Sequence, residues 1–556
     1  MESRPWQRHY DFFVQPSIRY PRIPLHQLLN IPASYYPDKA AIDFYGTEMT
    51  FWELRSMVWR MANALASLGV KKGDRIGMNL PNCPQYVIAN HAALCLGAVV
   101  VNLNPMYTAP ELKHAARASG MTTIFTFDAV LPRISELCKQ VDLPRVIVTK
   151  PSDFLDGVPC STKKSLDLEP KWHHFSELLE SCPQANRPRV QVAPEDPCMI
   201  QFTGGTTGVP KPALLTHANL VTGTFLCALW GAYIADLKPI EVRRVVGVLP
   251  LFHVYGNICV MNWALLSCAT QILIPRFDID EMIGTLARFK EITYFPAVPT
   301  LITALLNHPK AAELELGKRI GLLGSGAAPM PQELIEQVKD LGIFFSEGWG
   351  MSETTSEGVS TPLMGLKKTG SIGVPLPDTD IRIVDVENGV EEVKKGEPGE
   401  LLIKGPLVMK EYYGNPEATA EQLKDGWLST GDIVVQDEDD YIFVVDRKKD
   451  MVIAGGFNIY PREIDEVLFE HPKVLDAVAV GIPDEYRGET LKCYVVLKPG
   501  ATASGEEIIA YCKGKLAAYK VPKLVEFRDE LPKTAVGKIL RKILREEEAA
   551  KLKLES

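Results

Sequence analysis

The pattern of apolar and polar residues alternates between two kinds of segment from about residue 40 to residue 300. Short runs rich in β-branched residues, such as DRIGMNL and AVVVNL, alternate with helical stretches such as QYVIANHAALCLG. That alternation is typical of an α/β fold in layers with a mostly parallel sheet. The most apolar stretch, from Tyr86 to Leu103, contains His91 and predicts a short buried helix and a valine-rich strand rather than a membrane span.

The pattern differs in two later regions. Residues 151–196 are rich in proline, serine and charge, have weak periodicity, and predict a long surface loop. Residues 370–445 contain short strands, such as IRIVDV, ELLIKG and YIFVVD, between glycine, proline and aspartate turns. This second region therefore predicts a β-rich subdomain or a distorted barrel.

A charged segment, DRKKD at residues 446–450, separates the β-rich region from an amphipathic helix, REIDEVLFEH. We place a domain boundary there. The expected architecture is a large N-terminal domain of layered α/β subdomains over residues 1–447, which includes the β-rich subdomain, and a small α+β domain over residues 448–556. Strands AVAVGI and KCYVVLK, a helix around EEIIAYCKGKL and a charged final helix are expected in the small domain.

Composition and charge narrow the classes of function. The chain has 556 residues, 46% of them hydrophobic and 23% charged, which is the balance of a folded globular protein with at least two domains. Its formal net charge of −9 gives it no basic surplus for nucleic acid. Its 11 cysteines form no CxxC pair, and its first residues, MESRPWQRHYDFF, do not resemble a secretory signal. We therefore expect a cytoplasmic enzyme with reduced thiols.

The sharpest local motif is a segment rich in glycine and threonine, MIQFTGGTTGVPK, at residues 199–211. Glycine lets the backbone turn its N–H groups inward, and such a nest with hydroxyls and a cation suits phosphate oxygens. The motif predicts a triphosphate-binding loop, although a bare glycine-rich string is an ordinary turn about as often, and the Walker spacing GxxxxGK[ST] is absent. The predicted phosphate-binding residues are Thr203, Gly204, Gly205, Thr206, Thr207 and Gly208, with Lys211 as a mobile charge.

Five further motifs follow this loop along the chain: SGAAPM (325–330), GWGMSET (348–354), STGD (429–432), DRKKDMVIAGGFNIYPREIDEVL (446–468) and PKTAVGKILRK (532–542). With the loop, they make the chain from about residue 30 to residue 545 resemble the acyl-adenylate-forming superfamily, which includes acyl-CoA synthetases, firefly luciferases and the adenylation domains of peptide synthetases. The resemblance implies two half-reactions. A carboxylate attacks the α-phosphorus of ATP and releases pyrophosphate, and the thiol of coenzyme A then displaces AMP.

The resemblance also implies the nucleotide contacts. The Trp349 ring and the backbone of residues 326–328 would hold the adenine, Ser352 would touch the α-phosphate, and Glu353 would bind Mg²⁺ together with phosphate oxygens. Asp432, expected at a strand-to-turn position in STGD, would accept hydrogen bonds from both ribose hydroxyls with help from Arg447, although an isolated aspartate in such a turn usually caps the backbone. The full set of nucleotide-contact residues is Gly326, Ala327, Ala328, Gly348, Trp349, Gly350, Ser352, Thr354, Asp432 and Arg447.

Lys538 matches the family's adenylation lysine, although a lone lysine near the end of a chain is usually a solvated surface charge. A long ammonium side chain on a mobile C-terminal domain would approach the carboxylate and the α-phosphate in the first step and withdraw afterwards. Lys449 matches the hinge of that movement, and the same charged segment also fits a plain linker. After the rotation, Gly455 and Gly456 would line the pantetheine tunnel.

The expected acyl pocket follows from the same resemblance. His253, in LPLFHVYG, would gate the pocket or position the carboxylate rather than act as a base, although a histidine among aromatic residues more often packs. No charged residue falls among the lining positions, which favours an apolar acyl group over an amino acid. Pro212 stands where many relatives have glycine, and because it fixes φ and removes an N–H it bears on the turnover rate. The lining residues are Tyr255, Gly256, Val298, Gly324 and Ser325.

These observations predict an ATP-dependent fatty acid–CoA ligase for medium- to long-chain acids, with ATP, Mg²⁺ and coenzyme A, that is most similar to bacterial long-chain fatty acid–CoA ligases. The alternatives are an aryl or other carboxylic acid–CoA ligase, a fatty acyl-AMP ligase and, more distantly, a non-catalytic nucleotide-binding regulator. An apolar substrate suggests peripheral contact with the inner face of the membrane. The sequence leaves a homodimer open.

Overall fold

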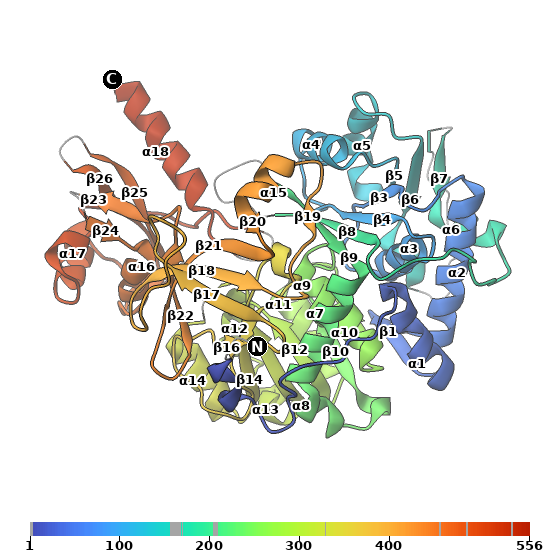
Figure 1. Ribbon diagram of the computed structural model, residues 1–556, viewed down its shortest axis with the longest axis horizontal. Coiled ribbons are helices and arrows are strands. Elements are labelled where there is room, and N and C mark those ends of the chain that lie inside the picture. The colour runs from blue at the N-terminus through green and yellow to red at the C-terminus, as the bar shows by residue number, and fades with distance from the viewer. Residues whose placement is uncertain are drawn as a thin grey trace. The chain divides into compact units, whose positions relative to one another are not determined.

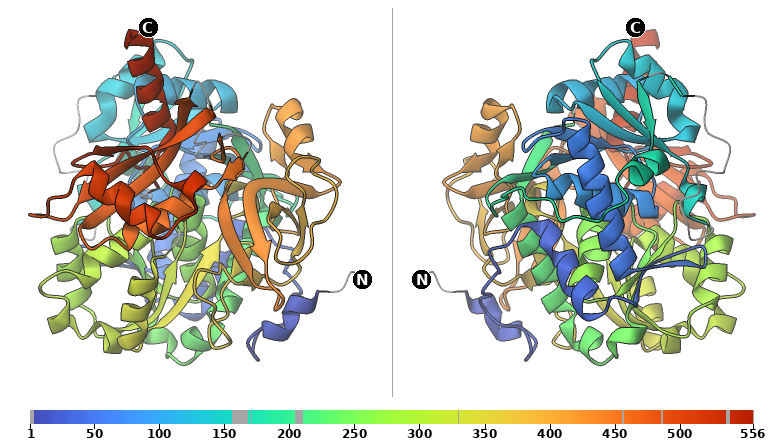
Figure 2. Two further views of the ribbon diagram at one scale, coloured as in Figure 1. Left: turned by 90° about the vertical axis from the view of Figure 1, so that its left-hand side faces the viewer. Right: turned by 90° about the vertical axis from the view of Figure 1, so that its right-hand side faces the viewer.

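The computed structural model describes residues 4–155, 168–169, 171–203, 210–328, 330–454, 457–484, 487–534 and 538–555, which Figures 1 and 2 show as ribbons. These residues group into two compact units. Unit 1 runs to Thr203, from Pro210 to Asp380 and from Lys404 to Gly426, and unit 2 contains Ile381–Ile403 and the chain from Trp427 onward. Unit 2 thus holds most of the expected β-rich subdomain together with the expected C-terminal domain, and a boundary at residue 447 stays a prediction.

An eight-stranded sheet in unit 1 has the order β19-β9-β8-β4-β3-β5-β6-β7. The strands from β8 to β7 in this order run parallel, whereas β9 and β19 are antiparallel to their neighbours. The expected mostly parallel sheet is therefore confirmed. The strand bounds are β3 (Arg75–Met78), β4 (Val99–Asn102), β5 (Thr123–Phe127), β6 (Arg145–Thr149), β7 (Trp172–His174), β8 (Pro197–Phe202), β9 (Pro212–Thr216) and β19 (Glu411–Tyr412).

The most apolar segment forms α3 (Pro84–Cys95) and then β4, as expected. All 12 residues of α3 are buried, since the helix packs against β3 and β4 and also against α2 (Phe51–Ser67), the blue helix in Figure 2. A helix covered on all sides needs no polar face, which is why its sequence reads as one apolar run. The opposite face of this sheet packs against α4 (Ala109–Ser119) and α5 (Leu131–Cys138), whose apolar residues share a core with Val99 and Val101.

The expected long surface loop at residues 151–196 is wrong in part. Its described residues include β7, which extends the sheet by pairing in parallel with β6, and α6 (Phe175–Ser181), which packs against α2. The strand Trp172–His174 has three residues and no alternation of apolar and polar positions, so its formation depends on the neighbouring strand rather than on a local pattern.

A nine-stranded sheet in unit 1 has the order β16-β15-β14-β13-β12-β10-β11-β1-β2. The six strands from β14 to β1 run parallel, and antiparallel strands close both edges. The bounds are β1 (Ala40–Phe44), β2 (Thr47–Thr50), β10 (Arg244–Gly247), β11 (Thr270–Leu273), β12 (Ile292–Ala297), β13 (Ile320–Ser325), β14 (Phe344–Trp349), β15 (Val359–Ser360) and β16 (Val374–Pro375).

Helices connect and cover these strands (Figure 1). The helix α7 (His217–Trp230) follows β9 directly, and the Thr216 hydroxyl caps its first turn by accepting a hydrogen bond from the Asn219 N–H group. No helix in the described part of the chain combines the length and the apolar character that crossing a bilayer requires. The other helices of unit 1 are α1 (Asn30–Tyr35), α8 (Ala232–Asp236), α9 (Val254–Gly256), α10 (Trp263–Leu266), α11 (Ile279–Ala287), α12 (Pro299–Leu306), α13 (Leu316–Arg319), α14 (Gln332–Asp340) and α15 (Pro416–Gln422).

Unit 2 contains the expected β-rich strands and a small α+β assembly. The β-rich strands of unit 2 are β17 (Asp380–Val384), β18 (Gly399–Lys404), β21 (Trp427–Gln436) and β22 (Ile442–Arg447), whereas β20 (Leu423–Lys424) lies in the Lys404–Gly426 segment of unit 1. A second five-stranded sheet consists of β23 (Val452–Ala454), β24 (Phe457–Ile459), β25 (Val474–Asp484), β26 (Gly488–Leu497) and β27 (Leu524–Phe527). The strands and helices expected here are confirmed, the helices being α16 (Pro461–Phe469), α17 (Gly505–Lys513) and α18 (Arg541–Glu555).

Candidate active site

The two ends of the predicted phosphate loop lie side by side. The strands β8 and β9 pair so that Phe202 faces Pro212. Just beyond this pair, the Thr203 N–H group donates to the Lys211 carbonyl at 2.9 Å, and the Lys211 N–H group donates to the Thr203 hydroxyl at 3.2 Å. The loop therefore leaves and re-enters the sheet at one point. Pro212 is the first residue of β9, a strand position that tolerates the missing N–H group.

Tyr412 joins two of the predicted catalytic residues. The Lys211 ammonium lies 5.0 Å from the centre of the Tyr412 ring, within the range of a cation–π contact. The Tyr412 hydroxyl donates a hydrogen bond of 2.7 Å to Oε1 of Glu353. The sequence motifs did not indicate Tyr412, which reaches this place because β19 pairs with β9 and sets Tyr412 opposite Ala213. One ring thus separates a cation and a carboxylate that both belong to the candidate site.

Glu353 is buried in a single 3-10 turn, η8 (Ser352–Thr354), which follows β14. The Met409 N–H group donates to its carbonyl at 2.7 Å, so the turn is fixed through its backbone as well as through Tyr412. Ser352 and Thr354 are also buried, and the Thr354 hydroxyl accepts a hydrogen bond from the Met351 N–H group. The predicted α-phosphate and Mg²⁺ contacts therefore share one rigid turn.

The predicted adenine contacts lie where neighbouring parallel strands end. Gly326 follows β13, and Gly348 and Trp349 end β14. Ala327 adopts a left-handed conformation with φ 68°, which is uncommon for a residue with a side chain. The buried carboxylate of Glu347 accepts a hydrogen bond of 3.1 Å from the Met330 N–H group and so holds the segment after β13 against β14. Gly350 follows β14 directly and Ala328 follows Ala327.

The predicted acyl-pocket residues also cluster at the carboxyl ends of strands. The Tyr255 hydroxyl donates to the carbonyl of Ala297, the last residue of β12, at 3.2 Å, and Val298 follows that strand. Gly324 and Ser325 end β13, which pairs with β12. His253 accepts a hydrogen bond from the Tyr255 N–H group on its Nδ1 at 3.2 Å and so caps the short helix that carries Tyr255 and Gly256. Its predicted gating role stays a prediction.

In unit 2, Asp432 and Arg447 lie opposite each other on β21 and β22. The Asp432 side chain is almost fully buried, and its Oδ1 lies 2.5 Å from Nε of Arg447. The expected strand-to-turn position of STGD is wrong, because residues 429–432 lie within β21. The Thr430 hydroxyl donates to the Leu401 carbonyl on β18 and accepts from the Asp432 N–H group, which explains polar residues inside a strand.

Lys538 lies close to the Asp432 and Arg447 pair. A turn holds its backbone, since its N–H group donates to the Thr534 hydroxyl and its carbonyl accepts from the Thr534 N–H group. The positive charge of Arg447 and then burial lower the pKa of Lys538 to about 7, although Asp432 acts in the opposite direction. The predicted hinge residue, Lys449, is exposed at the end of β22. Its role as a hinge stays a prediction.

Some predicted residues lie outside the described part of the chain. Among the described residues, no group of three or more histidine, cysteine, aspartate or glutamate side chains is arranged to hold a metal. A single carboxylate at Glu353 fits Mg²⁺, which is usually bound through one or two carboxylates together with substrate phosphates and water. The predicted site residues that the structure does not describe are Gly204, Gly205, Thr206, Thr207 and Gly208 of the loop and Gly455 and Gly456 of the expected tunnel.

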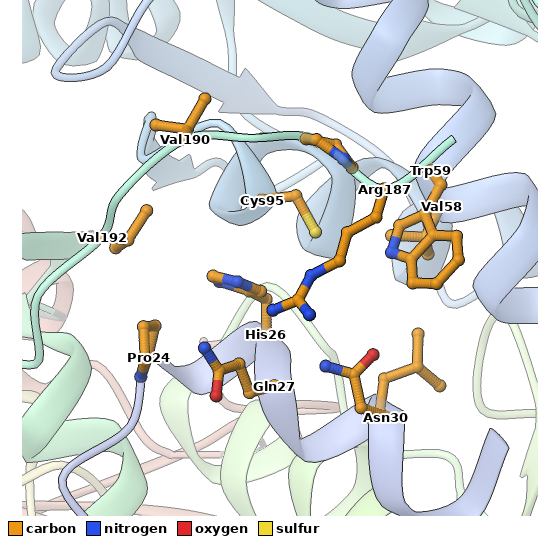
Figure 3. Close-up of a pocket in the computed structure, with 12 residues that line it drawn as sticks. Pro24, His26, Gln27, Asn30, Val58, Trp59, Cys95, Arg187, Val190 and Val192 are labelled. Carbon is orange, nitrogen blue, oxygen red and sulfur yellow. The ribbon is translucent and has the colours of Figure 1, made fainter. Parts of the chain in front are cut away.

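A separate pocket in unit 1 contains none of the predicted site residues (Figure 3). Arg187 points into it, toward His26, Gln27 and Asn30. His26, Gln27 and Asn30 come from the N-terminal segment, and the Trp59 ring of α2 lies beside them. Because the candidate catalytic groups lie elsewhere in the chain, this pocket takes no part in the chemistry considered below.

Comparisons with known proteins agree with the motifs. A family model described as AMP-binding enzyme matches residues 31–413, and one described as AMP-binding enzyme C-terminal domain matches residues 463–538. A long-chain-fatty-acid–CoA ligase of Bacillus subtilis (strain 168) is 39% identical over 557 residues, 98% of each chain. A feruloyl-CoA synthase of an Amycolatopsis species is 36% identical over 91% of this chain and 95% of its own length.

Solved structures agree in the same way. An anthranilate CoA ligase in complex with anthranoyl-AMP is 26% identical, with a TM-score of 0.84 over 96% of this chain and 98% of its own. The first family model alone covers more than half of this chain, and the order of motifs, the α/β fold and the near full-length relatives all agree with it. The chain belongs to the AMP-binding enzyme family.

Proposed function

We propose that this protein is an ATP-dependent fatty acid–CoA ligase that forms an acyl-adenylate, releases pyrophosphate and then transfers the acyl group to coenzyme A. The observation that carries the proposal is the arrangement of Lys211, Tyr412 and Glu353 beside the ends of the predicted phosphate loop. A cation and a carboxylate held on one aromatic ring provide the two kinds of group that a nucleotide triphosphate with its magnesium ion requires. Near full-length similarity to a long-chain-fatty-acid–CoA ligase supports the choice of acid and acceptor.

The first half-reaction brings together two anions, the substrate carboxylate and the triphosphate. Lys211 and Lys538 would neutralise the charge that grows on the phosphate oxygens, while Ser352 would orient the α-phosphate. Glu353 would hold Mg²⁺, which would supply Lewis-acid chemistry that neutralises phosphate charge. The buried Asp432 carboxylate, oriented by Arg447, would receive the ribose hydroxyls and so position the sugar.

The second half-reaction requires a thiol to reach the carbonyl carbon that the first step activated. Lys538 must then withdraw, and a change of backbone conformation at Lys449 would accomplish this. Gly455 and Gly456, whose structure lies outside the description, would border the path of the pantetheine arm. This assignment rests on the match to the family's motifs.

The experiment is a pair of product assays with saturated acids of graded length, each with and without coenzyme A. We expect pyrophosphate release to depend on the supplied acid, and AMP and thioester to appear in equal amounts when coenzyme A is present. Without coenzyme A, a single turnover of pyrophosphate and a bound adenylate are expected.

Each competing function gives a different result in the same assays. Adenylate that persists with coenzyme A present would identify a fatty acyl-AMP ligase instead. Nucleotide binding without pyrophosphate release from any acid would identify a regulator and contradict the proposed function. Release that requires aromatic acids alone would identify an aryl-CoA ligase.

A further inference from the structure

Glu357 places a carboxyl group beside Gly348, a predicted nucleotide contact, and near Tyr255, a predicted residue of the acyl pocket. It lies between η8 and β15, and a Cβ atom at Gly348 would collide with its Oε1. A Cβ atom at Gly326 would lie 3.3 Å from both the Gly348 carbonyl oxygen and the Tyr255 ring. Glu357 and Tyr255 therefore approach the same glycine backbone at the ends of β13 and β14. Only residues without a side chain leave this space open.

The surroundings of Glu357 are apolar or weakly polar. Tyr294 and Tyr255 lie near enough for the charge of Glu357 to raise their pKa values, in addition to the larger effect of burial. The Cys227 and Cys259 sulfur atoms, 3.5 Å apart, lie in the same cluster. Among the described residues no ion pair includes Glu357, and Ser360 supplies a hydrogen bond. Burial raises the pKa of Glu357 to about 7.

The side chains of Glu357 and Tyr255 are both half-buried. Two such side chains on either side of two glycines are what the lining of a substrate pocket requires. Glu357 thus belongs to the surface that an acyl group would touch.

The backbone before Glu357 is strained. Thr355 and Ser356 both have positive φ angles, of 53° and 88°, and this is unusual for consecutive residues with side chains, above all for a β-branched threonine. The Thr355 hydroxyl donates to the Leu407 carbonyl at 2.6 Å and holds the turn in place. Strain of this kind is typical of functional sites. Here it leads the chain to a carboxyl group that has no ion-pair partner among the described residues, and burial of such a group costs stability.

We propose that Glu357 is a specificity-determining residue whose carboxyl group accepts a hydrogen bond from a hydroxyl group on the acyl part of the substrate. The proposal rests on the proposed function and narrows its substrates to hydroxylated carboxylic acids, either aliphatic or phenolic. It also revises the expectation of a purely apolar pocket. An acid that lacks the hydroxyl would place a hydrocarbon chain against the carboxyl group and offer it no hydrogen bond, so the transition state for that acid would be less stabilised.

The test compares acids that differ by one hydroxyl group. Decanoate is compared with decanoates hydroxylated at carbon 3, 6 or 10, and cinnamate with 4-hydroxycinnamate, in wild type, Glu357→Leu and Glu357→Gln. We expect the wild type to favour at least one hydroxylated acid by roughly 10- to 100-fold in kcat/KM. Glu357→Leu should favour the plain acid of the same pair, and Glu357→Gln, which keeps an acceptor oxygen, should retain part of the preference.

The pH dependence of this ratio gives a second readout. The carboxyl group is neutral below its pKa of about 7 and charged above it, and a charged acceptor forms the stronger hydrogen bond. The wild-type preference for the hydroxylated acid should therefore rise as the pH passes 7, and Glu357→Gln should show no such rise. Of the groups that face Glu357, Cys227, Tyr255 and Tyr294 stay neutral in this range, because the contact with Cys259 and then burial raise the pKa of Cys227 and burial raises the pKa values of Tyr255 and Tyr294. Changes that both acids share, including those at Lys538, cancel in the ratio.

Glu336→Leu on the exposed face of α14 is the matched control and should leave every ratio unchanged. The inference is overturned if the wild type prefers the plain acid in every pair, or if Glu357→Leu keeps the wild-type ratio while it folds and turns over decanoate. Absence of AMP from all acids would instead contradict the proposed function. Calorimetric binding of the same acid pairs, which needs no turnover, would then still decide the role of Glu357.

Discussion

The two units hold their charged candidate residues in opposite ways. In unit 1, the Lys211 ammonium lies over the face of the Tyr412 ring, and Glu353 accepts a hydrogen bond from the Tyr412 hydroxyl. A neutral group therefore stabilises both a cation and an anion. In unit 2, Arg447 and Lys538 lie together, and the Asp432 carboxylate is already bound to Arg447. The nearby Asp450 is paired with Arg545 at 2.9 Å. The described groups around Lys538 in unit 2 therefore have a local surplus of positive charge, whereas the charges of Lys211 and Glu353 in unit 1 cancel.

This difference indicates what each unit does before substrate arrives. The charges of Lys211 and Glu353 in unit 1 are already balanced around Tyr412. The positive charges of Arg447 and Lys538 repel each other, and this repulsion is the largest cause of the lowered pKa of Lys538, followed by burial. A polyanion such as a triphosphate would relieve it. We infer that binding of the nucleotide favours the charged, adenylating form of Lys538, and that loss of pyrophosphate weakens this effect.

Lys538→Ala should have the largest effect, because it removes the cation that is proposed to neutralise the phosphate and that contributes to the positive surplus in unit 2. We expect adenylation, measured by pyrophosphate exchange, to fall by about 10²- to 10³-fold, while thioester formation from a supplied acyl-adenylate stays within a few-fold of wild type. Lys542→Ala is the control, since that lysine forms only an exposed pair with Glu546 at 3.6 Å. Equal losses in both half-reactions would show that Lys538 has a structural role instead.

Glu353→Gln tests the balanced unit and should have the next largest effect. The amide keeps the shape and can still accept the Tyr412 hydrogen bond, but it removes the charge proposed to bind Mg²⁺. We expect kcat to fall by about 10²-fold, with a higher Mg²⁺ concentration needed for half-maximal rate. Glu333→Gln, on the exposed face of α14, should change neither quantity. An unchanged Mg²⁺ dependence would contradict the assignment of Glu353 as the metal ligand.

The contrast between the units also separates what the sequence predicts from what it does not. Periodicity predicts α3 and β4, because a segment buried on all sides must be apolar throughout. Motif order leads to Glu353 and Lys211. Tyr412 escapes both arguments, since it lies 59 residues from Glu353 and meets it only through the pairing of β19 with β9. Contacts made by long-range strand pairing leave no local signal.

Glu357 escapes the sequence argument for a different reason. It lies only four residues after Glu353, but two left-handed residues separate them, and neither helix nor strand periodicity indicates which way its side chain points. The same limit applies to STGD. Its serine, threonine and glycine are typical of a turn, yet the Thr430 hydroxyl donates to the Leu401 carbonyl of β18, and the segment lies within β21 with an irregularity at Gly431, whose φ is 71°. In both cases tertiary partners override the local preference.

Tyr412→Phe tests the balance in unit 1 more finely than Glu353→Gln. The ring remains to hold the Lys211 ammonium, while Glu353 loses a hydrogen bond to a charged acceptor, worth about 1.5–3 kcal/mol. We expect KM for magnesium ATP to rise by roughly 10-fold and the free energy of unfolding to fall by about 1–2 kcal/mol. Urea unfolding and initial rates measure the two effects. Full activity with lower stability would show that Tyr412 has a structural role and does not contribute to nucleotide binding.

The smallest expected effect is a shift of pH dependence, and it tests the cause of the charge surplus in unit 2. Lys538 must be protonated to neutralise phosphate, and its pKa of about 7 means that this form is lost as the pH rises through 7. We therefore expect kcat/KM for ATP, which reports the free enzyme, to fall on the alkaline side of about pH 7. In Arg447→Met the largest cause of the lowered pKa is absent, so the fall should begin at higher pH, leaving a few-fold more of the maximal rate at pH 8.

Glu357→Gln serves as the control for this prediction. That carboxyl group also titrates near 7, and its removal should leave the alkaline fall in kcat/KM unchanged. If the alkaline fall in kcat/KM shifts in Glu357→Gln and does not shift in Arg447→Met, the titrating group is Glu357 rather than Lys538. The positive charge around Lys538 would then not explain the pH dependence.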